Sequence, residues 1–289
     1  MHSNDRDWKH YNKKLVARGE FFIDPRFLAT WREEVAALNE RKVGQPYLYP
    51  DSLFEFAAAL WNKFDLRSLE GVLRGLSRHM GEWPAPSYSQ ISRRVERLRL
   101  AFPKREQRLV AGVDGTGLKV SNRGEWIRHK WAVQRGWVKV TLLGDIDGNI
   151  IDVRVGDDET DERAEARALI AEHADELSAV SADALHDTNE TFDLLDQHGI
   201  APVIKIRKNA RAAGLGARAR AVRAYQSVEH GEWVEQHGYG RRWVATEGIF
   251  SAVKRCFGET LRSHTRAGLA REARLKFWTY QRLREHMNA

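Results

Sequence analysis

The sequence predicts an α/β protein in which a mixed β-sheet flanked by helices follows an all-helical N-terminal domain. Three observations support this fold class. Apolar residues recur at helical spacing within the first hundred positions, short segments rich in Val, Ile and Trp begin at residue 108, and helical and strand-like segments alternate from residue 161. We therefore place a domain boundary after residue 105, with a helical domain over residues 1–105 and an α/β domain over residues 106–289.

Three helices are predicted in the second half of the N-terminal domain. Residues 52–64 carry apolar side chains on one helical face. Residues 66–80 follow Asp65, a residue type that caps helix starts. The third helix covers residues 87–102 and ends before a proline.

The third of these helices is strongly basic, since it carries Arg93, Arg94 and Arg97. Preceded by two amphipathic helices, it is suited to be the recognition helix of a helix-turn-helix-like unit that reads the major groove of DNA. A three-helix packing module with a charged exterior explains the same pattern equally well. Both interpretations stay open at this point.

The α/β domain begins with four strand-like segments, over residues 108–115, 126–134, 137–147 and 149–157. Helices are predicted over residues 161–177 and 188–199, strands over residues 179–185 and 201–207, and two further helices over residues 240–258 and 270–287. An antiparallel meander that continues through crossover units forms a mixed sheet with helices on its faces. This order of elements matches a ribonuclease H-like core.

The composition of the chain limits the kinds of binding partner and the cellular compartment that we expect. The chain has 47 Lys and Arg against 40 Asp and Glu, a formal charge of +7, which favours a polyanionic partner. Its single cysteine excludes an intramolecular disulfide and a zinc site of several cysteines. No run of about eighteen apolar residues occurs and the first residues are polar, so we expect no membrane span and a cytoplasmic location.

Three acidic residues lie where they can converge. Asp114 and Asp183 each end an apolar strand-like segment, and Glu247 lies in a predicted helix. Taken singly, the two aspartates are ordinary turn or capping residues, and the glutamate is an ordinary exposed helix residue. Taken together, two strand ends of one sheet can meet at one edge, where a helix packed on the sheet adds the third carboxylate.

Such a group of acids has a specific chemistry. Three carboxylates in a small space repel one another unless a cation holds them together. Mg²⁺ or Mn²⁺ takes hard oxygen ligands and suits a phosphate substrate, and two such ions can stabilise the attacking and leaving oxygens of an in-line displacement. We therefore predict a site for divalent metal, with two ions, at Asp114, Asp183 and Glu247.

Two other acidic segments receive simpler interpretations. Residues 145–149 resemble the start of a calcium loop, but Gly156 stands where the loop needs a bidentate Glu, so a hairpin turn is expected. Residues 157–162 form an acidic cluster at a helix start, where negative charge offsets the helix dipole, and we expect them to be solvated.

Basic residues without an acidic neighbour gather between Gln197 and Val228: Lys205, Arg207, Lys208, Arg211, Arg218, Arg220 and Arg223. Two glycines interrupt them, which suggests a mobile loop that contacts DNA phosphates, with a solvated face as the alternative. Lys254 follows Glu247 by two helical turns, so both project from one helix face. Lys254 could contact the DNA backbone, although an ordinary surface lysine fits as well.

Three long segments carry a resemblance to a known family. Residues 111–134 (AGVDGTGLKVSNRGEWIRHKWAVQ), 180–211 (VSADALHDTNETFDLLDQHGIAPVIKIRKNAR) and 239–259 (YGRRWVATEGIFSAVKRCFGE) resemble the DDE transposases of prokaryotic insertion sequences, in particular the family-five group. Residues 8–22 and the region around residues 68–76 look like that group's N-terminal part, so the likeness covers nearly the whole chain.

The resemblance implies roles for particular residues. Asp114, Asp183 and Glu247 would be the catalytic and metal-binding carboxylates. A helix signature of Tyr, Arg, Glu and Lys would be filled by Tyr239, Arg242, Glu247 and Lys254, with one residue more than usual between the Arg and the Glu. Asp187 would be a supporting residue.

The resemblance also implies a reaction and partners. Such an enzyme nicks double-stranded DNA at the terminal inverted repeats of its element and joins the freed 3′-hydroxyl to target DNA, as a dimer or larger assembly. Two alternatives stay open: a transposase-derived DNA-binding protein that no longer cuts, and a ribonuclease H-like nuclease that acts on structured nucleic acid.

Overall fold

The computed structural model describes residues 7–81, 83–121, 137–157 and 159–288, and the chain divides into two compact units. Unit 1 comprises Met1–Leu100 together with Trp278–Ala289, and unit 2 comprises Ala101–Phe277. The helical unit therefore takes residues from both ends of the sequence. No helix among the described residues has both the length and the apolar character that crossing a membrane requires.

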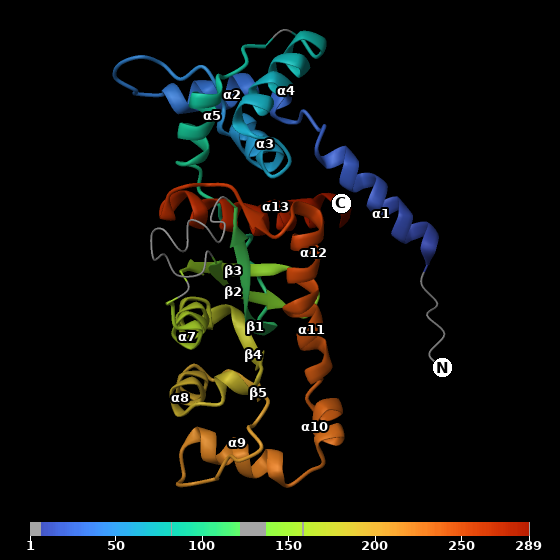
Figure 1. Cartoon of the computed structure of the whole chain (residues 1–289), viewed down its shortest axis with the longest axis vertical. Coiled ribbons are helices and arrows are strands. Elements are labelled where there is room, and N and C mark those ends of the chain that lie inside the picture. The colour runs from blue at the N-terminus through green and yellow to red at the C-terminus, as the bar shows by residue number, and fades with distance from the viewer. Residues whose placement is uncertain (1–6, 82, 122–136, 158, 289) are drawn as a thin grey trace. The chain divides into compact units, whose positions relative to one another are not determined.

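Unit 1 is helical (Figure 1). Its helices are α1 (Trp8–Phe21), α2 (Phe27–Asn39), α3 (Asp51–Trp61), α4 (Leu66–His79), α5 (Tyr88–Val95) and the C-terminal part of α13 (Arg266–Asn288). The two predicted helices before the basic one are confirmed as α3 and α4, and the Asp65 side chain caps α4 by accepting the N–H groups of Arg67 and Ser68. The basic helix is shorter than predicted, because α5 ends at Val95 and leaves Arg97 in the turn that follows.

Unit 2 is built on a mixed six-stranded sheet. Its strands are β1 (Leu109–Val120), β2 (Trp137–Asp145), β3 (Ile150–Gly156), β4 (Leu177–Ala182), β5 (Ala201–Ile204) and β6 (Thr260–Leu261). The order is β3-β2-β1-β4-β5, with β6 paired to the far end of β1. The β1–β2 and β2–β3 pairs are antiparallel, whereas β4 pairs with β1 and β5 in parallel. The strand predicted over residues 126–134 lies outside the described residues.

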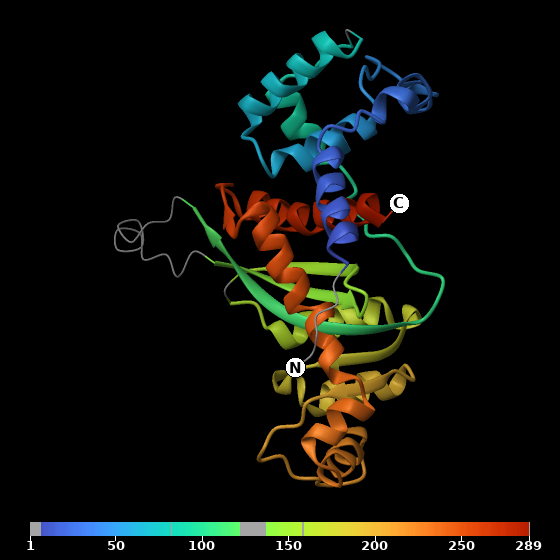
Figure 2. The same cartoon turned by 90° about the vertical axis from the view of Figure 1, so that its right-hand side faces the viewer.

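Helices cover both faces of this sheet (Figures 1 and 2). The helices of this unit are α7 (Glu162–Glu172), α8 (Asn189–Gln197), α9 (Ala217–Gln226), α10 (His230–Gln236), α11 (Arg242–Ala245), α12 (Glu247–Phe257) and the N-terminal part of α13; α7 and α8 lie on one face of the sheet, and α11 and α12 on the other. The main core lies between the sheet and α7 and α8, where Val113, Leu169 and Phe192 are buried. This architecture confirms the predicted mixed sheet flanked by helices and is compatible with a ribonuclease H-like fold.

Two glycines bring α11 against the other face of the sheet. Gly112 of β1 and Gly144 of β2 are cross-strand partners. A Cβ built on Gly144 would lie 2.3 Å from the carbonyl oxygen of Ala245, and one on Gly112 would lie 2.8 Å from the Ala245 Cβ. Only residues without a side chain allow the α11 backbone to come this close to the sheet. The glycine pair therefore sets where α11 lies relative to β1.

Candidate active site

Asp114 and Asp183 lie at the same edge of the sheet. The parallel register of β1 and β4 ends with the pair Gly112 and Ser181, and each aspartate follows two residues later in its own strand direction. The carboxylate of Asp183 accepts a hydrogen bond from the backbone N–H of Leu185 at 2.8 Å. Beyond Gly112, β1 has no partner on its β4 side until β6 pairs with Lys119, as far as the described residues show. Both acids therefore lie beside an open strand edge.

Arg242 joins Asp114 to Glu247. Its guanidinium donates one hydrogen bond to the Asp114 carboxylate at 2.9 Å and another to the Glu247 carboxylate. The side chains of Arg242 and Asp114 are 15% and 18% exposed, while that of Glu247 is 37% exposed. The positively charged guanidinium of Arg242 thus lies between two of the three predicted acids and offsets their negative charges at a partly buried surface.

The prediction of a single helix over residues 240–258 is wrong, because a 3-10 turn covers Tyr239–Arg241 and the α-helix that follows is interrupted at Thr246. Thr246 has φ −130° and ψ −83°, which ends α11 and starts α12. Its hydroxyl donates to the Arg242 carbonyl at 2.9 Å and also contacts the Glu247 carboxylate. A threonine that bonds to the carbonyl four residues earlier is a known cause of helix bending. Glu247 therefore opens a helix of its own beside the sheet edge.

The electrostatics of Asp114 follow from this placement. Burial raises the pKa of the Asp114 carboxyl, and the negative charge of Glu247 raises it further. The Gly115 N–H and Arg242 act in the opposite direction without restoring the ordinary pKa. Further positive charge near the Asp114 carboxyl would therefore favour its ionised form.

A fourth acid, Glu162, lies beside the two aspartates. Its carboxylate covers Gly115, because a Cβ built on that glycine would lie 2.4 Å from the carboxyl carbon. Burial raises the pKa of Glu162, with Asp114 and Asp183 as the next contributions. The expectation that residues 157–162 are solvated is therefore wrong for Glu162. It holds for Glu159, which is exposed.

The other residues of the helix signature gather around the same edge. The Lys254 ammonium donates to the Thr116 hydroxyl of β1 at 2.9 Å. The Tyr239 hydroxyl donates to the carbonyl of Ala182, the residue before Asp183, at 3.3 Å, and the Arg242 guanidinium lies 5.7 Å from the Tyr239 ring. The extra residue before Glu247 has not separated these side chains.

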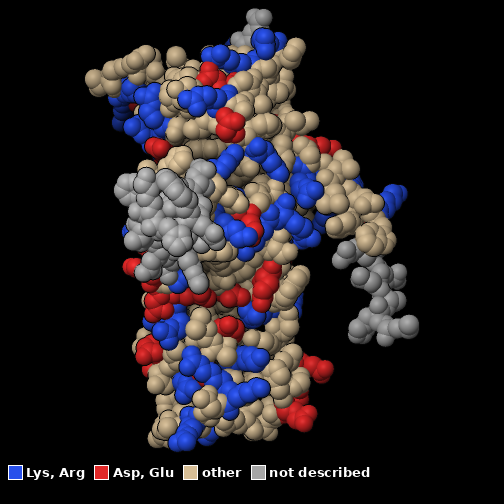
Figure 3. All heavy atoms as spheres, in the orientation of Figure 1, with Lys and Arg blue, Asp and Glu red and all other residues tan. Residues whose placement is uncertain are grey.

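The basic residues between Gln197 and Val228 divide into two groups. Arg218 pairs with the fully buried Asp187 carboxylate, and residues 217–226 form helix α9 in place of the predicted loop. Arg207 is partly structural too, since it donates to the carbonyls of the turn after Asp183. Lys208 and Arg211 are exposed, and no hydrogen bond or ion pair links them to any described residue. In Figure 3, basic side chains cover the lower end of unit 2, and a band of acidic side chains lies above them at the level of α7.

In unit 1 the predicted basic residues line a cavity of about 300 Å³ together with Tyr47. Arg94 is held by an ion pair to Asp51 and lies 4.8 Å from the Tyr47 ring, so its charge supports the packing of this unit. Arg93 and Arg97 line the same cavity and are exposed, and the Arg93 Nε donates to the Ser89 carbonyl at 3.1 Å.

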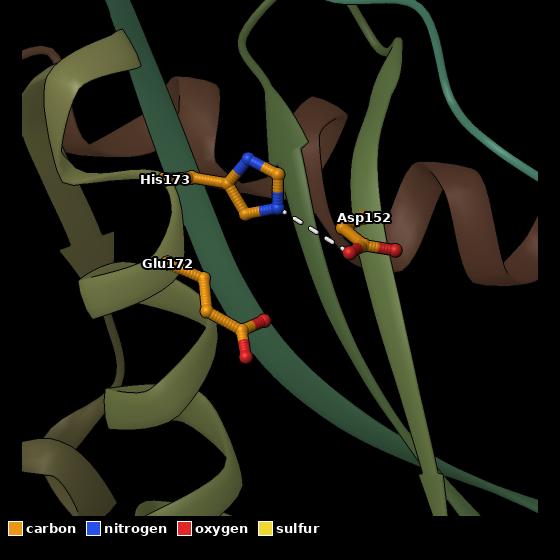
Figure 4. Close-up of side chains that lie close together, drawn as sticks. All are labelled: Asp152, Glu172 and His173. Carbon is orange, nitrogen blue, oxygen red and sulfur yellow. Dashed lines mark hydrogen bonds and ion pairs between the residues drawn. The ribbon is translucent and has the colours of Figure 1, made fainter.

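One group of metal-ligand type side chains lies elsewhere in unit 2. Ligand atoms of Asp152, Glu172 and His173 lie within 4.8 Å of one another (Figure 4). Asp152 pairs with Arg274 at 2.9 Å and with the imidazole of His173 at 3.3 Å. The hydrogen bond that the His173 imidazole donates to the Asp152 carboxylate raises the pKa of His173, and a second one to Glu176 raises it further. Since Asp152 is already paired with Arg274 and Glu172 with Arg154, and acids paired with Arg are poor metal ligands, we interpret this group as an ion-pair network.

The donor chemistry of the candidate site fits a divalent cation better. Asp114, Asp183, Glu162 and Glu247 supply only carboxylate oxygens, the ligands that Mg²⁺ and Mn²⁺ prefer. Gly115 leaves the room in which the Glu162 carboxylate lies, and Arg242 already holds positive charge between two of the acids. The sequence pointed to three of these carboxylates but missed Glu162, whose only signal was its place at the start of a helix.

Models of known protein families match most of the chain. Two family models, both described as Transposase DDE domain, match residues 16–123 and residues 105–282. The second match spans more than half of the chain and includes every carboxylate of the candidate site. Family membership implies dependence on a divalent metal and binding to DNA. The chain belongs to the DDE transposases of the insertion-sequence type.

Proposed function

We propose that this transposase cuts DNA at the terminal inverted repeats of its element and joins the freed 3′-hydroxyl to target DNA, on paired ends as a dimer or larger assembly. The observation that carries the proposal is the meeting of Asp114 and Glu247 on Arg242, at the sheet edge where β4 delivers Asp183. Separate elements of the fold bring these side chains to one open edge.

Asp114, Asp183 and Glu247 would hold the divalent cation. When bound, Mg²⁺ or Mn²⁺ would lower the pKa of an attacking hydroxyl and neutralise the charge of the leaving oxygen. Asp114 lies in β1, Asp183 directly follows β4, and Glu247 begins α12. These rigid elements keep the carboxylate oxygens in place before the substrate arrives.

The reaction is a pair of phosphoryl transfers. In the first, a water molecule loses a proton as its oxygen bonds to phosphorus, the bond from phosphorus to the 3′ oxygen breaks, and that oxygen takes up a proton to become the new 3′-hydroxyl. In the second, this hydroxyl loses its proton and bonds to a target phosphorus, whose own 3′ oxygen leaves and takes up a proton. Lys254 and Arg242 would hold phosphate oxygens near the reacting atom, and Tyr239 would support Arg242.

The remaining basic residues would hold more distant DNA. Lys208 and Arg211 in unit 2 and Arg93 and Arg97 in unit 1 are suited to phosphate contacts, which add affinity without reading sequence. Their substitution should weaken DNA binding uniformly and reduce its salt dependence.

The test is cleavage of DNA that carries the inverted repeats flanking the gene of this chain. With Mg²⁺ or Mn²⁺ the native chain should nick the repeat ends, and Asp114→Asn and Asp183→Asn should lower the rate by at least 10³-fold, on the order of losing a catalytic group. Asp193→Asn, an exposed acid of α8, is the matched control and should cut normally. Cleavage that survives Asp114→Asn would remove the assigned site, and specific end binding without any cutting would identify a DNA-binding protein instead.

A further inference from the structure

We infer that Trp233 of α10 is a positioning residue for the active site, because its buried ring holds Tyr239 against the end of β4 and beside Arg242. The inference rests on the proposed function, since it concerns the same site. It goes further by giving a role to a residue outside the helix signature of Tyr, Arg, Glu and Lys. In Figure 1, α10 lies between α9 and α11 at the lower end of unit 2.

Trp233 is the residue that anchors α10. This helix has seven residues, all of them described, and Trp233 is the one that is buried, with 5% of its surface exposed. A helix this short is not stable on its own in water, so its position depends on tertiary packing. The contacts of the Trp233 ring therefore fix where α10 lies.

The Trp233 ring lies between α9 and the 3-10 turn that follows α10. Its centroid is 4.8 Å from the ring centroid of Tyr225 in α9 and 5.2 Å from that of Tyr239 in the turn, and aromatic pairs attract each other at such distances. The His237 imidazole stacks on the Trp233 ring at 5.0 Å and donates through Nδ1 to the Trp233 carbonyl at 2.9 Å. Because Tyr225 packs against the main core, Trp233 connects that core to Tyr239.

A glycine turns the chain from α10 toward this contact. Gly238 has φ 59° and ψ 27°, in the left-handed region, and lies between His237 at the end of α10 and Tyr239. Glycine adopts this conformation without the steric cost that a Cβ brings, which makes it common directly after a helix. The chain changes direction at Gly238, and the Tyr239 ring comes to lie against Trp233.

Tyr239 links this aromatic cluster to two parts of the candidate site. Its hydroxyl donates at 3.3 Å to the carbonyl of Ala182, the last residue of β4 and the one before Asp183. Burial raises the pKa of the Tyr239 hydroxyl, so it keeps its proton and donates at neutral pH. The guanidinium of Arg242, which bonds to the other two acids of the site, lies 5.7 Å from the Tyr239 ring. A shift of this ring would therefore disturb both the end of β4 and the position of Arg242.

The first experiment measures cleavage of the repeat-end DNA by the full chain. Trp233→Leu should lower kcat by about 10-fold or more, because small displacements of catalytic groups reduce rates by this order. The KM for DNA should stay within about 3-fold of the native value, since the buried ring supplies no contact to the substrate. Trp233→Phe, which keeps an aromatic ring, should restore kcat to within about 3-fold. A native kcat in folded Trp233→Leu would overturn the inference.

Phe192→Leu is the matched control for the loss of a buried ring. Phe192 of α8 is 2% exposed and belongs to the main core. Both leucine substitutions should lower the melting temperature, so cleavage is measured where circular dichroism shows every variant to be folded. Phe192→Leu should keep kcat within about 3-fold of the native value, because its effect is confined to stability. Equal losses of kcat in the two variants would show that Trp233 only stabilises the fold, and would refute the inference.

A double-mutant cycle tests whether Trp233 acts through Tyr239. Tyr239→Leu should itself lower kcat, because it removes both the ring and the bond to the Ala182 carbonyl. In that background Trp233→Leu should reduce kcat little further, since the contact it breaks is already lost. Two losses that multiply in full would contradict the inference. If Trp233→Leu does not fold, Trp233→Met, whose flexible side chain fills irregular space, replaces it with the same expected results.

The two proposals fail in different ways. If the native chain cuts the repeat ends, Asp114→Asn does not, and Trp233→Leu cuts as fast as Phe192→Leu, the role of Trp233 is refuted and the proposed function stands. If the native chain cuts no repeat ends with Mg²⁺ or Mn²⁺, the proposed function fails and the role of Trp233 fails with it.

Discussion

Gly144→Ala tests the packing that places Arg242 beside Asp114. The new Cβ would lie 2.3 Å from the Ala245 carbonyl oxygen and 2.8 Å from the Ile249 Cδ1, whereas ordinary contact begins at 3.4 Å. The α11 backbone must therefore move by about 1 Å, because a carbonyl cannot rotate away as a long side chain can. Overpacking of this kind costs about 1–3 kcal/mol, and the backbone contact favours the upper part of that range.

The assay is thermal unfolding of the full chain, followed by circular dichroism. A loss of about 2–3 kcal/mol corresponds to a drop of about 4–12 °C in the melting temperature for a unit of this size. Gly231→Ala in helix α10 is the control, since its Cβ would meet nothing within 4 Å and alanine favours a helix, so its melting temperature should hold or rise. Equal melting temperatures for Gly144→Ala and the native chain would refute the close approach of α11 to the sheet.

Three further predictions follow from the charges of unit 2. Arg218→Ala should cost about 3–5 kcal/mol in urea unfolding because it leaves a buried carboxylate unpaired, whereas Arg220→Ala, whose ion pair is exposed, should cost less than about 1 kcal/mol. Because the pKa of His173 is raised in the folded state, its contribution to the unfolding free energy is fully present below pH 6.5 and is lost as the pH rises through the folded-state pKa. The resulting pH dependence of the unfolding free energy should vanish in His173→Asn and persist in His264→Asn. Arg242→Gln leaves Asp114 and Glu247 without their arginine partner, so it should lower the metal-free melting temperature and enlarge the increase in melting temperature that Mn²⁺ produces. A smaller increase would contradict the view that the Arg242 guanidinium occupies the place of a metal ion between these acids.

The fold could be predicted from the sequence wherever the local pattern and the burial agree. Apolar strand-like segments separated by Asn, Asp and Gly became β1 to β5, apart from the segment that lies outside the described residues. Residues 217–226 were not predicted as a helix because three arginines alternate with their apolar residues and two glycines precede them. The helix is held by tertiary contacts that no local pattern reveals, namely the burial of Val222 in the core and the bond from Arg218 to the buried Asp187.

The candidate site was predictable only in part, for a related reason. Asp114 and Asp183 follow apolar strand-like segments, which is a local signal of a strand end at a sheet edge. Glu162 lies in a run of acids whose other members serve as caps or face solvent, so its sequence context predicts a solvated residue. Its actual neighbours come from β1 and β4, and only the parallel pairing of those strands brings them together.

The unusual interval between Arg242 and Glu247 is explained by the break at Thr246. At 3.6 residues per turn, residues four apart differ by about 40° around a helix, and residues five apart differ by about 140°. In one continuous helix the two side chains would therefore project from different faces, and Arg242 could not bridge Asp114 and Glu247. The break at Thr246 reorients the chain between them, and the structure shows both carboxylates bonded to the one guanidinium. The added residue and the broken helix thus compensate for each other, and Glu247 keeps its place at the sheet edge.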